Sequence, residues 1–261
     1  MLCFYYIRDK HIYSKKRGEL TSSYQKVHEE LILFGKPAIN VSTWPEVYSA
    51  CMGTMTVLND RFAKTVVKDR VGVPDLAAGK IRVGNEEYPM MLIGREVRKS
   101  GQWIWAWDMD AEKHMLSMEA KKAGDVHGIL PLVIGNISLS RALNGHTLST
   151  AACALFGQRT CYYRCMNHDG CDYAAVICPD IEGFVDSDGF KKVAEKCLVS
   201  DMVDQVVFAK NFLAQNGTPF ETDKNTVLAH FDDADLLIMY AVLKGRTKIT
   251  KMVKYYDVYV N

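Results

Sequence analysis

The stretch QWIWAWDMD, residues 102–110, has tryptophan at three alternate positions, and this pattern constrains the fold more than any other in the chain. In a β-strand alternate side chains point to the same face, so Trp103, Trp105 and Trp107 would form one row of indoles. Each indole covers a large apolar area and carries an N–H that needs an acceptor when buried. A strand with this row requires either a thick core or an aromatic cleft.

Both interpretations of the tryptophan row give specific residues a role. In the first, the row is a core face covered by a helix. In the second, Trp103, Trp105 and Trp107 line a cleft for a flat ligand or a peptide, with Asp108 and Asp110 as nearby polar groups. Three adjacent exposed indoles would form an apolar surface patch that promotes association with other molecules, so the core interpretation is favoured. The two aspartates precede a predicted helix, so capping and the helix dipole explain them without cation binding, which is the alternative.

The hydrophobic pattern along the chain predicts an α+β protein. A helix is expected from Thr43, with proline in its first turn, and another over residues 232–245. Runs with a period of two predict strands within residues 80–109, 160–178 and 246–260. We expect them to form one antiparallel sheet with helices packed on one side. Such a sheet can curve around a pocket lined by Trp105 or Trp107.

The 261 residues are enough for one large domain, which we expect to span the whole chain. A subdivision near residue 180 is the alternative. It would separate a sheet-rich part, residues 1–180, from a helix-rich part with a closing strand, residues 181–261.

The stretch TCYYRCMNHDGCDYAAVIC, residues 160–178, contains four of the eight cysteines, and the spacing of its cysteines and histidine resembles a metal-binding motif. The Asp-Gly pair between two alternating runs predicts a hairpin instead. Along a strand Cys161 and Cys165 would lie about 13 Å apart, too far for two sulfurs on one zinc ion. Cys165, His168 and Cys171 remain as a weaker three-ligand alternative, and no C-x2-C pair accompanies them. We therefore expect structural thiols and no metal, with a redox or nucleophilic role as a further alternative.

Composition excludes several classes of function. With 32 basic and 31 acidic residues the net charge is +1, which lacks the electrostatic footprint of a nucleic-acid-binding protein. No run approaches the roughly 18 apolar residues that span a bilayer, and the first residues do not have the order of a secretory signal. We expect a cytoplasmic protein with reduced cysteines. The nucleophile-elbow, P-loop, dinucleotide-binding and H-E-x-x-H motifs are all missing.

His146 and the pair Asp232 and Asp233 each lie at the start of a predicted helix, which explains them without a catalytic role. His146 lies at a predicted helix start, with Thr147 as its cap. It lies roughly 10 Å from Cys153, too far for a thiolate–imidazolium pair. Asp232 or Asp233 is expected to cap the helix predicted over residues 232–245.

The tryptophan motif also carries a resemblance. Gln102 to Trp107, the helical run from Leu148 to Phe156, and Tyr162-Tyr163-Arg164 together resemble a bacterial family known only as a domain of unknown function, with a W-x-W-A-W strand. The likeness covers roughly residues 40–180 and implies a bacterial origin. It implies no activity, and the cysteines of residues 160–178 are not part of its pattern.

Two classes of function remain open. The first is a non-enzymatic binding or interaction protein, favoured by the missing catalytic motifs. The second is an enzyme or small-molecule binder that uses a tryptophan-lined pocket with Asp108, Asp110, Arg164 or His168 as polar groups. The sequence leaves enzymatic activity undecided. It indicates no cofactor, and it allows a protein or small-molecule partner but neither nucleic acid nor a membrane.

Overall fold

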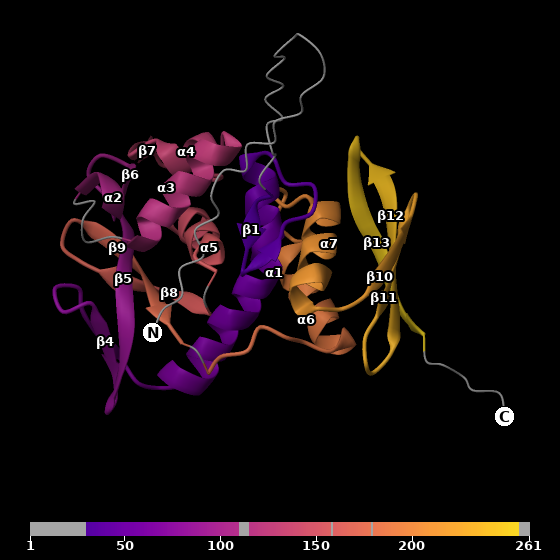
Figure 1. Ribbon diagram of the computed structural model, residues 1–261, viewed down its shortest axis with the longest axis horizontal. Helices are drawn as coiled ribbons and strands as arrows, with labels where there is room; N and C mark the ends of the chain where they lie inside the picture. The colour runs from indigo at the N-terminus through magenta and orange to yellow at the C-terminus, as the bar shows by residue number, and fades with distance from the viewer. Residues whose placement is uncertain (1–29, 110–114, 158, 179, 256–261) are drawn as a thin grey trace, which may run out of the picture.

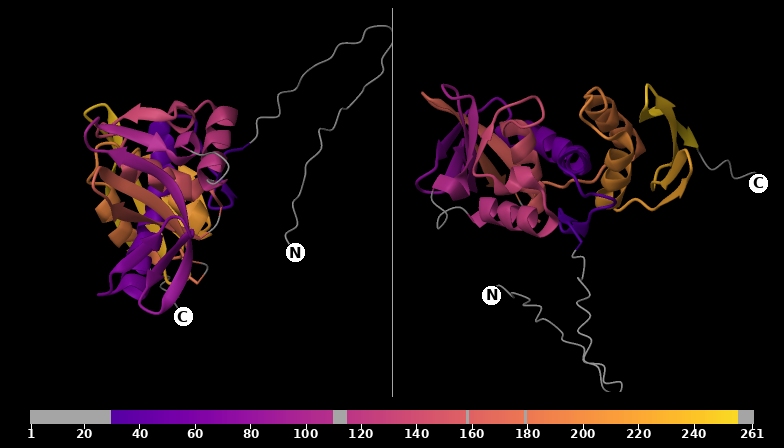
Figure 2. Two further views of the ribbon diagram at one scale, coloured as in Figure 1. Left: turned by 90° about the vertical axis from the view of Figure 1, so that its left-hand side faces the viewer. Right: turned by 90° about the horizontal axis from the view of Figure 1, so that it is seen from above.

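The computed structural model describes residues 30–109, 115–157, 159–178 and 180–255. Two antiparallel sheets lie at opposite ends of the molecule, and the longer helices occupy the space between them (Figures 1 and 2). None of the described helices has the length and apolar character needed to cross a bilayer.

The larger sheet is a curled half-barrel of seven strands. Its strands are β3 (Gly72–Asp75), β4 (Lys80–Val83), β5 (Glu86–Val97), β6 (Gln102–Trp105), β7 (Asn136–Ser138), β8 (Thr160–Met166) and β9 (Gly170–Ile177). The long strand β5 organises it, because residues 86–89 pair with β4, residues 94–97 with β6, and residues 90–97 with β9. A β-bulge between Leu92 and Gly94 interrupts the β5–β9 register. Bulges bend strands, so this one contributes to the curl.

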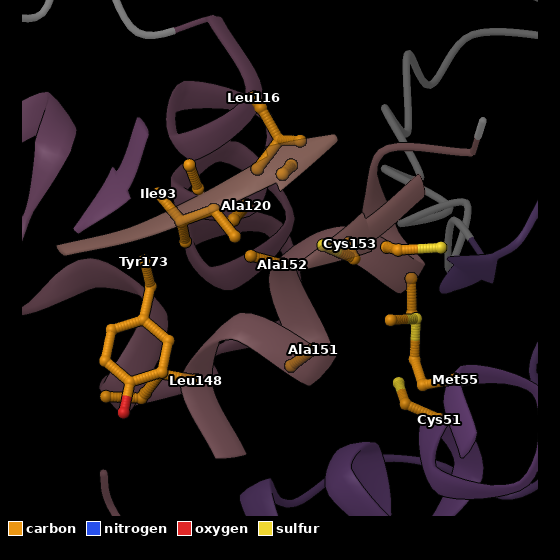
Figure 3. Packing of buried hydrophobic residues seen from close by; sticks show 14 of the residues in the cluster. Cys51, Met55, Ile93, Leu116, Ala120, Leu148, Ala151, Ala152, Cys153 and Tyr173 are labelled. Atoms are coloured by element: carbon orange, nitrogen blue, oxygen red, sulfur yellow. The ribbon is translucent and has the colours of Figure 1, made fainter. Parts of the chain in front are cut away.

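Four helices accompany the curled sheet, namely α2 (Ala106–Met109), α3 (Met115–His127), α4 (Leu130–Val133) and α5 (Gly145–Leu155). Their apolar side chains join those of the sheet in one core. Figure 3 shows part of it, where Leu148 of α5 lies beside Tyr173 of β9 and Leu116 of α3 beside Ile93 of β5. A short hairpin of β1 (Ile32–Leu33) and β2 (Lys36–Pro37) precedes this part of the chain.

The smaller sheet consists of β10 (Phe220–Asp223), β11 (Thr226–His230), β12 (Asp235–Leu243) and β13 (Arg246–Tyr255), in that order. Two helices, α6 (Ser187–Cys197) and α7 (Gln205–Asn216), lie on its inner side (Figure 1). A second core forms between them around Phe190, Phe208 and Phe212. The rings of Phe190 and Phe212 stack with their centroids 4.9 Å apart.

Helix α1 (Trp44–Arg61) lies between the two cores and continues as a π-helical segment, Phe62–Val67. A Cβ added to Gly53 would come within 2.4 Å of the Phe212 ring, so only glycine allows α7 to approach this closely. Beside it, Thr54 donates a 2.6 Å hydrogen bond to the Gln215 side chain, which in turn donates to the carbonyl of Ala50 at 3.1 Å. Buried amide groups need such partners, and here they also fix α1 against α7.

Several sequence predictions are confirmed. The α+β class with antiparallel strands holds, and α1 starts after Thr43 with Glu46 completing a capping box. The hairpin within residues 160–178 is present as β8 and β9, with Met166 opposite Cys171 at the turn.

Two predictions about the C-terminal part are wrong. The strand predicted over residues 246–260 does not join the larger sheet, because β13 belongs to the separate four-stranded sheet. The helix predicted over residues 232–245 is strand β12, in which Leu236, Ile238 and Tyr240 are buried and their neighbours are not. A short apolar run fits a helix and a strand almost equally well, and pairing with β11 and β13 decided for the strand. Asp232 and Asp233 therefore do not cap a helix there.

The tryptophan row is shorter than predicted. Strand β6 ends at Trp105, and the chain turns into the short helix α2, which carries Trp107. Trp103 and Trp105 lie on the strand with their rings edge to face, 5.3 Å apart at 88°.

Replacing Trp105 with alanine should lower the free energy of unfolding by about 3–5 kcal/mol, because it opens a large cavity in the first core. Urea unfolding followed by circular dichroism measures this loss. Trp44→Ala is the matched control and should cost less, since Trp44 is only half-buried. A loss for Trp105→Ala no larger than that for Trp44→Ala would contradict the core role of Trp105.

Candidate functional site

The three tryptophans of residues 102–110 belong to the core. Trp103 and Trp105 have no exposed surface, and Trp107 is 9% exposed. The indole N–H of Trp105 donates a 3.0 Å hydrogen bond to the carbonyl of Pro131, and Lys121 lies 4.4 Å from the ring centroid of Trp107. These contacts are made within the protein, which supports the interpretation of this row as a core face.

The described polar residues predicted beside the tryptophans are exposed, whereas the indoles are buried. Asp108 lies on α2 and is exposed, and Asp110 lies outside the described residues. Arg164 lies on β8 and is also exposed.

The three-ligand metal alternative does not fit the hairpin. Cys165 lies opposite Asp172, and Cys171 lies opposite Met166. Both thiols are buried, whereas the His168 side chain in the turn is 100% exposed. Within the described ranges, no three histidine, cysteine or acidic side chains converge as a metal site would require.

The described cysteines are packing residues. All seven are buried as free thiols. Figure 3 shows Cys51 and Met55 of α1 lying toward Cys153 of α5. Burial raises the pKa of Cys153 and of Cys165 to about 12. A thiol with so high a pKa is a poor nucleophile at neutral pH, so the nucleophilic alternative has no support here.

The seven described thiols should resist a thiol reagent while the protein is folded. We expect a Cys3→Ala variant, which removes the cysteine outside the described ranges, to react with less than about one equivalent of dithiobis-nitrobenzoate within minutes at pH 7.5. In guanidinium chloride, all seven remaining thiols of the same variant should react with the reagent. Rapid labelling of two or more thiols in the native variant would contradict the packing role.

A polar cluster lies at the end of the curled sheet, where β8 and β9 meet the start of α5. The guanidinium carbon of Arg164 lies 5.7 Å from the ring centroid of Tyr173. The Tyr173 hydroxyl donates to Glu96 at 3.2 Å, and the same carboxylate accepts the backbone N–H of Gly145 at 2.6 Å. A carboxylate at a helix N-terminus is stabilised by the exposed N–H groups and the helix dipole. The Glu96 carboxylate therefore provides the acceptor for a backbone N–H group in the first turn of α5.

His146, the second residue of α5, bridges two tyrosines. Its Nδ1 lies 2.5 Å from the hydroxyl of Tyr162, and its Nε2 lies 3.3 Å from the hydroxyl of Tyr48. Although His146 is an exposed residue, desolvation by the surrounding side chains, followed by the positive charge of Arg164, lowers its pKa below the usual value of 6.5. The neutral ring donates from one nitrogen and accepts at the other, so the two phenols and the imidazole form a hydrogen-bonded relay.

Sequence reasoning missed this relay. The predicted cap of α5 was Thr147, whereas the structure shows a capping box in which Asn144 accepts from the Thr147 N–H at 3.1 Å and is the N-cap. The helix start was visible in the sequence. The partners of His146 come from α1 and β8, and no local spacing connects these elements.

Replacing Arg164 with alanine should raise the pKa of His146, because it removes a nearby positive charge that disfavours the imidazolium. An NMR titration of the histidine ring protons measures the change, with His146→Gln identifying the resonance. Arg98→Ala, in the exposed turn after β5, is the matched control and should leave the pKa unchanged. An unchanged pKa in Arg164→Ala would show that the guanidinium does not act on the ring.

The same pKa shift predicts how stability depends on pH. A histidine whose pKa is lower in the folded than in the unfolded chain binds its proton more readily when unfolded. The stability that neutral His146 contributes is therefore present above about pH 6.5 and is lost as the pH falls through its folded pKa. Urea unfolding between pH 5 and 7 should show a smaller pH dependence in His146→Gln than in the wild type, and an equal dependence would contradict the shift.

A cleft of about 730 Å³ opens beside the relay. One wall is the first turn of α1 with Ala142, and the other is formed by residues 200–207 at the start of α7 and residues 245–248 at the start of β13. Tyr48 lines this cleft and also contacts His146, so the relay reaches the cleft wall. We name this hollow the Trp44 cleft, after the half-buried indole in its first wall.

Hydrogen bonds hold each wall of the Trp44 cleft together and join the two walls. The indole N–H of Trp44 donates to the carbonyl of Ala142 at 3.0 Å. The hydroxyl of Ser49 accepts the N–H of Asp204 at 2.8 Å, which joins α1 to the cap of α7. Gln205 accepts the N–H of Ile249 at 2.7 Å, which joins α7 to β13. The cleft is therefore preformed.

Two of the carboxylates around the cleft are already used by the protein. Glu46 accepts hydrogen bonds from Ser42 and Thr43 at 2.9–3.0 Å. Burial opposes its ionisation, but these bonds outweigh burial and lower the pKa of Glu46. Asp204 accepts the N–H groups of Val206 and Val207 at 3.0 Å as the N-cap of α7. Each carboxylate therefore uses one oxygen, Oε2 of Glu46 and Oδ1 of Asp204, to satisfy backbone N–H groups at a helix start.

Comparison with known protein families matches residues 45–179 to DUF6882, a family of unknown function. The matched residues include the His146 relay and most of the first wall of the cleft, but neither Trp44 nor the wall formed by residues 200–207 and 245–248. No curated protein and no solved structure matches the chain.

Proposed function

The chain belongs to the family of unknown function DUF6882, which brings no activity with it, and we propose from its own geometry that it is a non-enzymatic binding protein. The proposed ligand site is the Trp44 cleft. The observation that carries the proposal is a preformed cleft of about 730 Å³ whose two capping carboxylates are committed to helix N-termini. Its volume lies in the range of small-molecule sites.

The walls of the Trp44 cleft are suited to contact the apolar part of a ligand. The half-buried indole of Trp44 lies in one wall, and Met202, Val203 and Val206 lie in the other. Aromatic and aliphatic walls with a few polar groups are the usual composition of small-molecule sites. The hydrogen bonds that hold these walls in place also reduce the entropic cost of binding, because little has to be ordered when the ligand enters.

The second candidate is an enzyme or small-molecule binder that uses the His146 relay. A neutral imidazole held between two phenols beside an exposed guanidinium favours it, because such a group can move a proton to or from a bound anion. Arg164 from the predicted ligand-binding set belongs to this group, whereas Trp103 and Trp105 are buried away from solvent. The non-enzymatic proposal is preferred because both phenols already occupy the two ring nitrogens.

Binding of the neutral probe N-phenyl-1-naphthylamine tests the Trp44 cleft. Its fluorescence should rise with the wild-type protein. Val206→Arg, which places a long charged side chain at a half-buried position of the wall, should weaken binding by about tenfold or more, equivalent to ~1.4 kcal/mol.

Val126→Arg, on the exposed side of α3, is the matched control and should bind like the wild type. Circular dichroism of both variants monitors folding. Failure of the wild type to bind the probe, or equal binding by folded Val206→Arg, would refute the cleft as the site.

A further inference from the structure

The Trp44 cleft contains two positive charges that the protein does not neutralise with a carboxylate. Lys248 is half-buried on β13, where it pairs in register with Ala241, and within the described part of the chain it forms no ion pair. Arg246 lies two residues earlier on the strand and donates one 3.0 Å hydrogen bond, to the backbone carbonyl of Asp201. Residues two apart on a strand share a face, so both side chains lie on one side of β13.

Among the described residues, none of the carboxylates around the cleft forms an ion pair with Lys248 or Arg246. Glu46 and Asp204 are bound by backbone N–H groups at the starts of α1 and α7, where the helix dipole also offsets a negative charge. The Asp201 side chain is 65% exposed and has Arg141 at 3.9 Å. A partly buried cation without a counter-ion is costly, and an anionic ligand that pairs with it recovers that cost.

We infer that the ligand of the Trp44 cleft is a small amphipathic acid, with an apolar body of one or two rings and one acidic group that pairs with Lys248 and Arg246. This inference rests on the proposed function. The apolar body contacts Trp44 and the aliphatic side chains at the start of α7, and the acidic group lies at the start of β13. The hydrogen bond from Ile249 to Gln205 fixes the position of β13 relative to α7, and the bond from Arg246 to the carbonyl of Asp201 holds the guanidinium at the cleft.

Two probes that differ only in one acidic group separate this inference from the proposed function. 8-Anilinonaphthalene-1-sulfonate is N-phenyl-1-naphthylamine with a sulfonate added. We expect the folded wild type to bind the sulfonate about fivefold more tightly than the neutral probe, as one partly exposed charge pair allows. The advantage should shrink as sodium chloride is raised from 0.02 to about 0.5 M, because salt screens the pair.

Lys248→Met keeps the apolar stem and most of the length of the side chain, and it should remove most of the advantage of the sulfonate over the neutral probe. Lys224→Met, in the exposed turn between β10 and β11, is the matched control and should keep the advantage. Equal binding of the two probes by the wild type would overturn the preference for an acid and leave the cleft as a binding site. An advantage that persists in Lys248→Met and in the Lys248→Met/Arg246→Met double variant would overturn the assigned position of the acidic group. If neither probe binds, the proposed function itself fails.

Discussion

The two-sided burial of α1 is the constraint on which the rest of the structure depends. Val47, Ala50, Cys51, Met55 and Leu58 face the first core, and Tyr48 and Val57 face the second. An amphipathic helix with one apolar stripe can lie on the surface of a single sheet, but a helix that is apolar on two sides needs partners on both. The layered arrangement in Figures 1 and 2, with one sheet beyond each side of the helices, satisfies that need.

Close packing around α1 also explains why the cleft lies where it does. Gly53 and the Thr54–Gln215 hydrogen bond hold α7 directly against α1, and Ser49 extends the contact to the first residue before α7. The N-terminal ends of both helices consequently meet at one place, with the start of β13 beside them. Their capping groups are satisfied within the chain, which leaves the apolar side chains of the walls and the cations of β13 for the ligand that we propose.

The His146 relay and the Trp44 cleft share Tyr48, although different partners build them. The relay lies entirely within the residues matched to DUF6882, and the cleft takes its second wall from outside that match. A histidine whose two ring nitrogens are both hydrogen-bonded to phenols is better suited to holding Tyr48 at the cleft wall than to exchanging protons with a ligand. This chemical reason places binding ahead of catalysis in the proposed function.

The sequence by itself determined the local elements and the chemical character of several residues. Period-two runs predicted strands within residues 80–109 and the hairpin at residues 160–178, and the capping pattern at Thr43 predicted the start of α1. Strand geometry also excluded Cys161 and Cys165 from one metal site, because neighbouring positions fix such distances. The core interpretation of Trp103 and Trp105 followed from their size and spacing.

Only the tertiary structure decided where these elements meet. It divided the strands between two sheets and ended β6 at Trp105. It also turned residues 235–243 into a strand, because hydrogen-bonding partners from β11 and β13 settle a choice that an apolar run leaves open. It brought His146 to Tyr162, 16 residues away in the chain, and to Tyr48, 98 residues away, and it placed Lys248 at the cleft of Trp44. Contacts over such separations depend on the packing of whole elements, and no local pattern of residues records them.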